Sequence, residues 1–211
     1  METFLFGDEN ADIYLVQPVD DHDMGFIQKE YDLIARHFPE KRILLAAVHV
    51  DSWNKDLSPW EAPAVFGDEP FGNGAGETLE VITELMAGMK EGVPVIVGGY
   101  SLAGLFALWA VYQTDIFSGC VAASPSVWFP EWIGYAESHA IKTENVYLSL
   151  GNKESKTKNP VMRLVGECIK KQDMMLEGKR HILEWNEGNH FAEPEVRTAR
   201  GFVWAVEEVG R

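Results

Sequence analysis

The segment between residues 93 and 109 constrains the fold more than any other part of the sequence. It contains Val95, Ile96 and Val97, a run that is apolar on both alternating faces of a strand. A turn rich in small residues follows, and an almost wholly apolar stretch with helical length begins at Leu102. A strand and a helix that are apolar all round belong in a protein interior. The segment therefore predicts a central βα unit of a parallel sheet that is covered on both faces.

The rest of the chain repeats this alternation. Apolar runs rich in β-branched residues predict strands at 12–16, 42–50, 94–98, 118–123, 145–150 and 180–185. Helical spacing predicts helices at 26–38, 77–90, 102–112, 161–176 and 195–209. Strands that alternate with helices indicate βαβ units with right-handed crossovers. We expect one α/β domain over residues 1–211, a doubly wound and mostly parallel sheet with helices on both faces.

The charge balance excludes several classes of partner. The chain has 18 Lys and Arg against 33 Asp and Glu, a formal net charge of -15 at pH 7. Such a surface repels nucleic-acid phosphates and anionic lipids, so we expect neither a nucleic acid nor a membrane as a partner. It disfavours polyanionic substrates and tolerates neutral or cationic small molecules. Hydrophobic residues make up 46% of the chain, which is too apolar for a disordered acidic polypeptide.

The sequence carries no signal for export or for a metal centre. Cys120 and Cys168 give neither a disulfide framework nor a C-x-x-C spacing, so we expect two free thiols. The first residues are acidic where a signal peptide would be basic, and every apolar run is far shorter than the ~20 residues of a membrane-spanning helix. His22 and Asp23 lie in an acidic turn, but two residues do not make a metal site. We expect a cytoplasmic protein without metal or cofactor.

The turn after the 94–98 strand has the pattern of a nucleophile elbow. It reads Gly99-Tyr100-Ser101-Leu102-Ala103, with a small residue two positions before the serine and two positions after it. A serine on such a sharp turn is backbone-strained, and larger flanking residues would clash. The helix start also directs backbone N–H groups toward the hydroxyl, which favours an oxyanion there. Ser101 is therefore the candidate nucleophile.

A serine hydroxyl needs a positioned base to take its proton. Among the six histidines, His190 is the best candidate, because it follows the last expected strand and precedes the last expected helix. It would act as general base and then as general acid toward the leaving group. The other histidines have different places: His181 in a strand pattern, His37 and His139 at helix ends, His49 before the long 51–76 loop and His22 in the acidic turn.

The third member of such a constellation is a carboxylate that orients the histidine. Glu154 follows the 145–150 strand and is the candidate. The alternative interpretation is that Glu154 only pairs with Lys156 or Lys158 in a solvated cluster. Asp173 and Glu187 are weaker substitutes for the acid.

Two loops, 51–76 and 124–141, contain aromatic residues and are expected to lie beside these residues and to determine specificity. The 51–76 stretch has no clear period and ends in a Gly-rich run, and long loops of this kind are usually functional or disordered. It leaves the carboxyl end of a strand, where open α/β sheets bind ligands. The expected pocket aromatics are Trp53, Trp60, Phe71, Trp128, Phe129 and Phe191. Aromatic loop residues are equally often ordinary core edges.

The sequence resembles the putative esterase family of the α/β-hydrolase superfamily, which includes enterochelin esterase-like and esterase D-like enzymes. The resemblance rests on four segments in order: Asp56 to Trp60, Phe71 to Gly76, the elbow with the helix after it, and Ala123-Ser124-Pro125-Ser126-Val127-Trp128-Phe129. With Gly151 to Glu154 and Gly188 to His190, it spans most of the chain. Ala103 departs from the family's usual glycine, and the chain has no room for a lid beyond Pro130 to Ile141.

The resemblance implies hydrolysis of a carboxylic ester through an acyl-enzyme, with Ser101 as nucleophile, His190 as base and Glu154 at the acidic position. Some members of the family look like Ser-His dyads, so the acid stays open. The resemblance implies an oxyanion site made by the N–H of Leu102 and a second N–H near Ser52 or Trp53. It also makes Trp60 and Trp128 candidates for substrate binding.

Other functions fit the same residues. A thioesterase, an acyltransferase or a peptidase uses the same triad on the same fold. A hydrolase-fold protein that only binds a ligand is the alternative from another class, although a binding module has no need of a strained serine. We expect a small-molecule ester as substrate, and the oligomeric state stays open.

Overall fold

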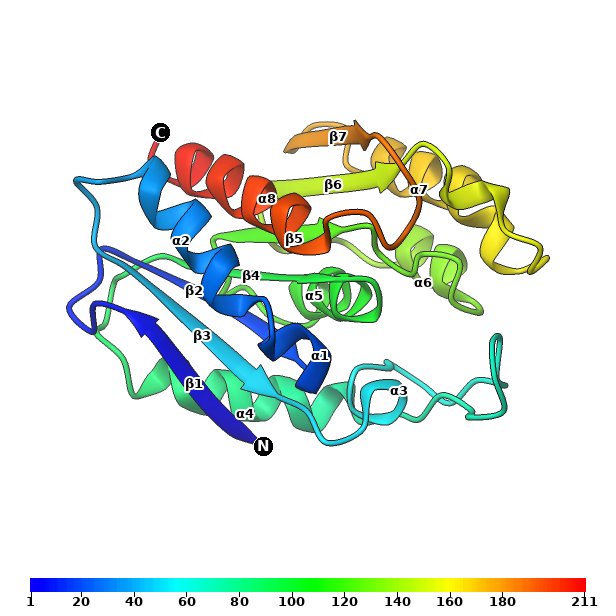
Figure 1. Ribbon diagram of the computed structural model, residues 1–211, viewed down its shortest axis with the longest axis horizontal. Helices are drawn as coiled ribbons and strands as arrows, with labels where there is room; N and C mark the ends of the chain where they lie inside the picture. Colours follow the sequence, from blue (N-terminus) through cyan, green and yellow to red (C-terminus); the bar gives the residue numbers. More distant parts are fainter.

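The computed structural model describes all 211 residues and contains one seven-stranded sheet. The strand order is β1-β3-β2-β4-β5-β6-β7, and Figure 1 shows the strands side by side. β1 pairs antiparallel with β3, while every other pairing is parallel. The strands are β1 (Glu2–Gly7), β2 (Ile13–Val19), β3 (Ile43–His49), β4 (Val95–Tyr100), β5 (Gly119–Ala123), β6 (Asn145–Gly151) and β7 (Arg180–Asn186).

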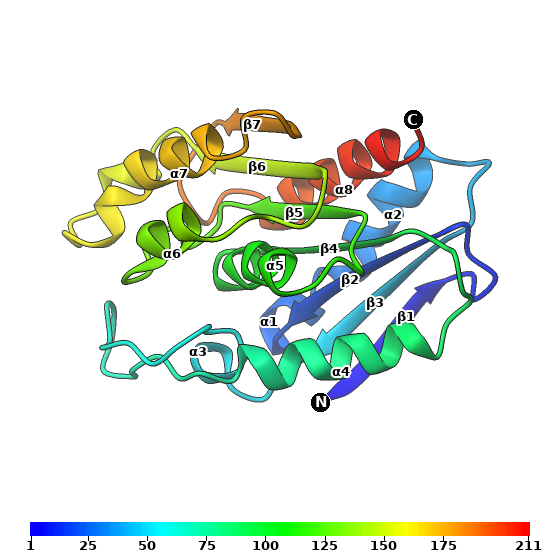
Figure 2. The same cartoon turned by 180° about the vertical axis from the view of Figure 1, so that it is seen from behind.

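Helices cover both faces of the sheet. In Figure 1, α2 (Ile27–His37) and α8 (Pro194–Val209) lie on the near face. Figure 2 shows the opposite face, which is covered by α4 (Ala75–Ala87), α5 (Leu102–Gln113) and α7 (Val165–Met174). Three shorter helices lie near the ends of strands: α1 (Asp21–Met24), α3 (Trp53–Asp56) and α6 (Trp132–Ser138). Two 3-10 turns, Glu154–Lys156 and Met162–Leu164, precede α7.

The core consists of two apolar layers that the sheet separates. The larger cluster has 37 buried residues around α5, and the smaller has 16 beneath α2 and α8. Every residue of α5 is buried except Trp109 and Gln113, which explains why this helix is apolar on all sides. A sheet covered on both faces requires strands that are apolar on both faces, and β2, β3, β4, β5 and β6 are almost wholly buried.

The fold class predicted from the sequence is confirmed, and each expected strand overlaps one of β2 to β7. The sequence analysis missed β1, which lies at the edge of the sheet and alternates between exposed and half-buried positions. It also missed α1, α3 and α6, because helices of four to seven residues are too short to show a period. The 51–76 segment is therefore not wholly loop: it contains α3 and a bridge between Ala62 and Phe71.

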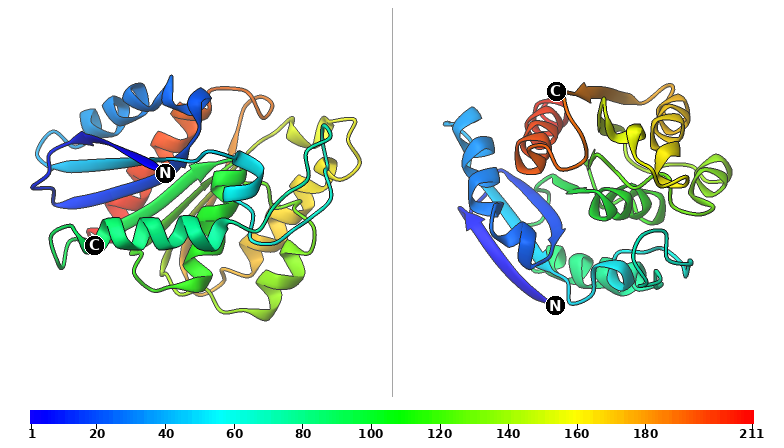
Figure 3. Two further views of the ribbon diagram at one scale, coloured as in Figure 1. Left: turned by 90° about the horizontal axis from the view of Figure 1, so that it is seen from below. Right: turned by 45° about the vertical axis from the view of Figure 1, so that its right-hand side comes forward.

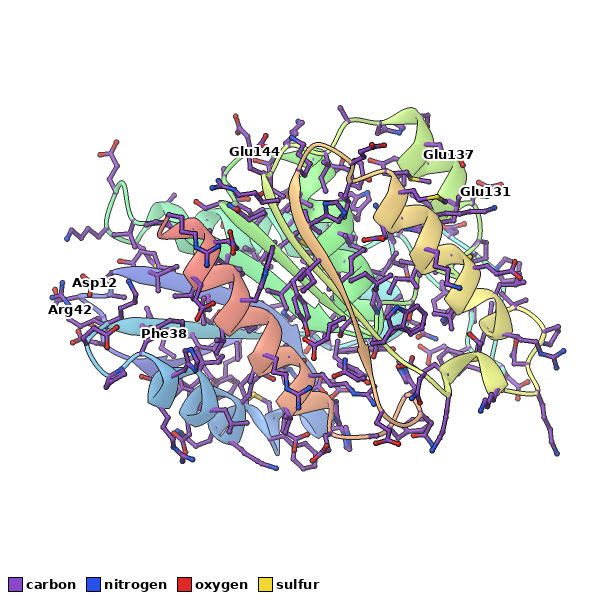
Figure 4. The ribbon with its side chains drawn as sticks, turned by 90° about the horizontal axis from the view of Figure 1, so that it is seen from above. Asp12, Phe38, Arg42, Glu131, Glu137 and Glu144 are labelled. Atoms are coloured by element: carbon purple, nitrogen blue, oxygen red, sulfur yellow. The ribbon has the colours of Figure 1, made fainter.

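The long connections gather at one end of the sheet. The carboxyl ends of the parallel strands point toward this end, and the 57–74 and 152–164 segments project beyond it in Figure 3. The starts of β2 and β3 lie at the opposite end, where Arg42 pairs with Asp12 at 2.5 Å (Figure 4). Ligands of open α/β sheets bind at the carboxyl end, so the site belongs with the long connections. Among the helices, none has the length and apolar composition required to cross a bilayer.

Gly201 allows α8 to approach the sheet closely, and this contact gives a test of the packing. A methyl group at this position would overlap Val121 Cγ1 and lie 2.7 Å from Tyr147 Cδ1. We expect Gly201→Ala to lower the free energy of unfolding by about 1–3 kcal/mol, the usual cost of overpacking a core. Gly134→Ala in α6 is the control, because nothing lies within 4 Å of its added methyl group. Urea unfolding measures both, and equal stability of the two variants would contradict the close packing of α8.

Candidate active site

Ser101 sits on a strained turn between β4 and α5. Its φ is 57° and its ψ is -118°, a conformation that non-glycine residues rarely adopt. The turn brings Gly99 so close to the start of the helix that a methyl group there would lie 2.7 Å from Ala103 Cβ. Residue 99 must therefore be glycine, while the helix itself tolerates the alanine at position 103.

Ser101, His190 and Glu154 form a chain of hydrogen bonds. His190 Nε2 lies 3.0 Å from Ser101 Oγ, and His190 Nδ1 lies 2.8 Å from Glu154 Oε2. An ionised carboxylate can only accept, so Nδ1 carries the hydrogen and donates a hydrogen bond to Glu154. Nε2 is then the acceptor for the serine hydroxyl. This is the arrangement in which an imidazole can take a proton from a serine.

Glu154 is held in place by several donors. Its Oε1 accepts from the backbone N–H of Gly151 at 2.6 Å and from the hydroxyl of Ser124 at 2.8 Å. Burial alone would raise the pKa of this carboxyl, but the hydrogen bond and charge of His190, helped by Gly151 and Ser124, outweigh burial and lower the pKa. Glu154 therefore remains ionised at neutral pH and can stabilise an imidazolium.

Arg197 was not singled out in the sequence, although it completes this network. Its Nη1 donates to Glu154 Oε1 at 3.1 Å, to Tyr100 Oη at 3.1 Å and to Ser124 Oγ at 3.3 Å. The residue is only 2% exposed. A nearly fully buried arginine requires an anionic partner, and Glu154 is that partner. The only sequence signal is a charged residue on the inward face of α8.

The alternative acids lie elsewhere. Asp173 lies 3.5 Å from His181, not near His190. Glu187 contributes its backbone carbonyl, which accepts from Arg197 Nη2 at 2.9 Å. Among the three carboxylates considered, the structure brings Glu154 to His190.

The expected oxyanion donors differ in availability. Leu102 and Trp53 are the first residues of α5 and α3, where backbone N–H groups have no partner within the helix. The N–H of Ser52 instead donates to Asp56 Oδ2 at 2.9 Å. Since that donor is already used, Trp53 is the better second candidate. Asp56 was not predicted, yet it anchors this turn by accepting also from the N–H of Asp51 at 3.1 Å.

The aromatic residues expected near the site divide into two groups. Trp53, Trp128 and Phe191 line cavities beside the hydrogen-bonded chain. Trp60, however, lies outside both cavities, because its Nε1 donates to Pro130 O at 3.0 Å and its ring packs against Phe129. The remaining pair, Phe71 and Phe129, is buried in the core with ring centroids 5.0 Å apart.

Two cavities meet at His190 and Phe191. One has a volume of about 550 Å³ and contains Ser101, Tyr100 and Trp53. The other has a volume of about 420 Å³ and contains Ser124, Glu154 and Trp128. The lining comes from the expected 51–76 and 124–141 segments only in part. Segments 20–26, 153–165 and 189–195 line the cavities as well, and the sequence analysis did not expect this of the first two.

The buried Arg197–Glu154 pair can be tested by removing its cation. Breaking a buried ion pair leaves an uncompensated charge, so we expect Arg197→Met to lower the free energy of unfolding by about 3–5 kcal/mol. Arg200→Met is the matched control on the same helix, because the Arg200 side chain is 55% exposed and binds Glu184 at the surface. Its loss should stay below about 1 kcal/mol. Similar urea midpoints for the two variants would contradict a stabilising role for Arg197.

Comparisons with known proteins bear on the fold. No protein-family model matches the sequence, and no curated protein matches it. Among solved structures, the siderophore hydrolase EstA from Aspergillus nidulans is similar with a TM-score of 0.72 and 17% identity, covering 98% of this chain and 90% of that chain. An IroE-like serine hydrolase from Shewanella oneidensis has a TM-score of 0.74 and 14% identity, covering 95% of this chain and 74% of that chain.

The BES protein from Bacillus cereus is a third similar structure, with a TM-score of 0.66 and 17% identity. The match covers 94% of this chain and 85% of that chain. All three likenesses extend over nearly the whole of this chain. At such low identity they concern the architecture alone. This chain has the α/β-hydrolase fold.

Proposed function

We propose that the protein is a serine hydrolase that cleaves carboxylic esters through an acyl-enzyme. The observation that carries the proposal is the chain of hydrogen bonds from Ser101 Oγ through His190 to Glu154, at 3.0 and 2.8 Å. A strained serine at the end of a parallel strand, paired with an imidazole, is costly to maintain without a chemical role. The similar solved structures include hydrolases by name, which supports the same class of reaction.

In the first half-reaction, His190 Nε2 takes the proton of Ser101 Oγ as the oxygen attacks the ester carbonyl carbon. The carbonyl π electrons move to the oxygen, and the N–H groups of Leu102 and Trp53 stabilise the resulting anion. The imidazolium is stabilised by Glu154. When the tetrahedral intermediate collapses, the bond to the alkoxy oxygen breaks, and His190 gives its proton to the departing alcohol.

In the second half-reaction, water replaces the alcohol. His190 takes a proton from the water while its oxygen attacks the acyl carbon, and the same N–H groups hold the second oxyanion. Collapse then breaks the bond to Ser101 Oγ, which regains its proton from His190. The products are a carboxylic acid and the free enzyme.

The two cavities on either side of His190 would receive the two parts of a small-molecule ester. The exposed ring of Phe191 borders both, so the ester bond would lie beside this residue and the nucleophile. Thioesterase, acyltransferase and peptidase activities begin with the same acylation of Ser101 and remain alternatives. The cytoplasmic location expected from the sequence remains a prediction.

A fluorophosphonate probe tests the proposal directly. The probe reacts with serines that are activated by a neighbouring base, so we expect one covalent adduct per chain on the peptide that contains Ser101. Ser101→Ala should abolish labelling. Ser126→Ala is the matched control, because the hydroxyl of Ser126 lies only 3.4 Å from that of Ser101 but has no contact with His190.

Labelling is read by intact-mass spectrometry on protein shown to be folded by circular dichroism. The proposal would be contradicted by folded protein that stays unlabelled, or by labelling that survives Ser101→Ala. Turnover of simple esters, thioesters and peptides by the unlabelled enzyme then distinguishes esterase from thioesterase and peptidase.

A further inference from the structure

The cavity that contains Ser101 is acidic on one side. Four carboxylates line it, from the turn that holds α1 and from the start of α8: Asp20, Asp23, Glu193 and Glu195. Both segments line this cavity at the carboxyl end of the sheet, near the beginning of α2 (Figures 1 and 3). The net charge of the chain alone does not explain this, since the other cavity beside His190 is lined by Lys153 and Lys156. The two cavities therefore differ in charge. The part of the Ser101 cavity that these four carboxylates line is called the acidic arm.

A small cavity lies behind the acidic arm. Its volume is about 20 Å³, and it shares Asp23, Phe26, Tyr100, Pro194 and Glu195 with the larger cavity, so the two adjoin. This is room for a single group of about the size of a water molecule.

Two buried oxygens in this small cavity have no partner. Glu30 Oε1 and Gln17 Oε1 both lack a hydrogen bond, although their residues are only 4% and 5% exposed. Unpaired buried acceptors are rare in folded proteins because each one loses its hydration without compensation. What both oxygens lack is an N–H or O–H donor.

Only part of the acidic charge is balanced within the chain. Glu195 Oε1 accepts from Lys29 Nζ at 2.7 Å, and Asp20 Oδ1 accepts from the backbone N–H of Asp23 at 2.9 Å. Asp23 itself forms no ion pair with a lysine or arginine. Burial, with the charge of Asp20, raises its pKa to about 6. Burial and the charge of Asp23 likewise raise the pKa of Glu30.

Aromatic rings form the other walls of the acidic arm. Phe26 and Phe191 are 41% and 86% exposed, and Trp53 lies on the same cavity. Exposed rings beside carboxylates favour an organic cation, because the faces of aromatic rings attract positive charge. A metal ion is a poorer fit, since no group of three or more His, Cys, Asp or Glu side chains is arranged to hold one.

We propose that the acidic arm binds a primary ammonium group of the substrate, so that the enzyme acts on esters whose acid or alcohol part carries an amine. The ammonium group would reach the small cavity and donate to Glu30 Oε1, Gln17 Oε1 and the Asp23 carboxylate. An ammonium group has three donors and no acceptor, which matches these three oxygens. This inference rests on the proposed ester hydrolysis, because Ser101 lies in the same cavity.

The test compares esters that differ only in charge. One pair is 4-nitrophenyl 6-aminohexanoate and 4-nitrophenyl heptanoate, in which a methyl group replaces the ammonium group. The second pair places the charge on the alcohol side, with 3-aminopropyl benzoate and butyl benzoate. We expect kcat/KM to favour the amine in at least one pair by about tenfold or more, mainly through a lower KM, since the contact is uniform binding remote from the reacting atoms.

The variants Asp23→Asn and Glu30→Gln should each reduce this preference by about tenfold, because each replaces a carboxyl oxygen that can accept from the ammonium group by an NH2 group that can only donate. Asp21→Asn and Asp32→Asn are the matched controls. They make the same change of net charge on α1 and α2, but neither residue lines the cavities. If Glu30→Gln fails to fold, Asp23→Asn alone decides. A preference that the controls reduce as much as the test variants would show a general surface-charge effect and overturn the assignment.

The preference should also depend on pH. As the pH rises through about 6, Asp23 loses its proton and gains the charge that holds the cation, so the preference for the amine should increase. The ionisable groups that share these two cavities with Asp23 are Asp20, His22, Glu30, Tyr100, His190, Glu193 and Glu195 with its partner Lys29. A preference that is constant between pH 5 and pH 8 would contradict the role of Asp23.

Failure of this inference can be distinguished from failure of the proposed function. Hydrolysis of both members of each pair at equal rates, lost in Ser101→Ala, would leave an esterase without an ammonium subsite. No hydrolysis of any ester and no labelling of Ser101 would contradict both the proposed function and the ammonium-binding site.

Discussion

The site depends on the backbone hydrogen bonds that hold Ser101 in its strained conformation. The N–H of Ser101 donates to Ala123 O at 3.1 Å, and Ser101 O accepts from the N–H groups of Leu105 and Ser126 at 3.1 and 2.9 Å. These bonds tie the turn to β5, to α5 and to the loop after β5. A single residue in a rare conformation costs on the order of 1–3 kcal/mol, so it persists only where its surroundings fix it. The conformation of Ser101 therefore depends on the buried centre of the sheet, to which these hydrogen bonds tie it.

The polar network around Glu154 connects three strand ends to α8. Ser124 follows β5, Gly151 ends β6 and His190 follows β7, while Arg197 reaches the carboxylate from the helix. The same carboxylate thus joins the sheet to the helix and orients the imidazole. Stability and chemistry are linked here, because loss of the buried arginine would both destabilise the fold and leave the acid without its cation.

The sequence predicted the parts of the site whose signals are local. The small residues around Ser101 and the apolar strand and helix on either side are contiguous in the sequence. Their apolar composition by itself indicates that they are buried. Arg197 and the acidic arm could not be predicted in this way, because Asp23, Glu30 and Glu195 come together only when α1, α2 and α8 pack against one another. Trp60 resembled a pocket residue because it lies in an aromatic loop, yet the fold directs it to Pro130. Strand β1 alternates in burial, but its place at the edge depends on pairing with β3.

In the proposed mechanism, His190, oriented by Glu154, activates Ser101 to form an acyl-enzyme. Pre-steady-state hydrolysis of 4-nitrophenyl acetate measures this step directly. We expect a burst of one nitrophenolate per chain and an acetyl group on the Ser101 peptide. The burst rate should fall about 10⁴-fold in Glu154→Gln, as loss of tautomer control requires, and should change little in Glu187→Gln. The mechanism would be contradicted by a burst rate in Glu154→Gln within about tenfold of the original, the size of a minor acid–base effect. Turnover without an acetyl adduct would contradict it as well.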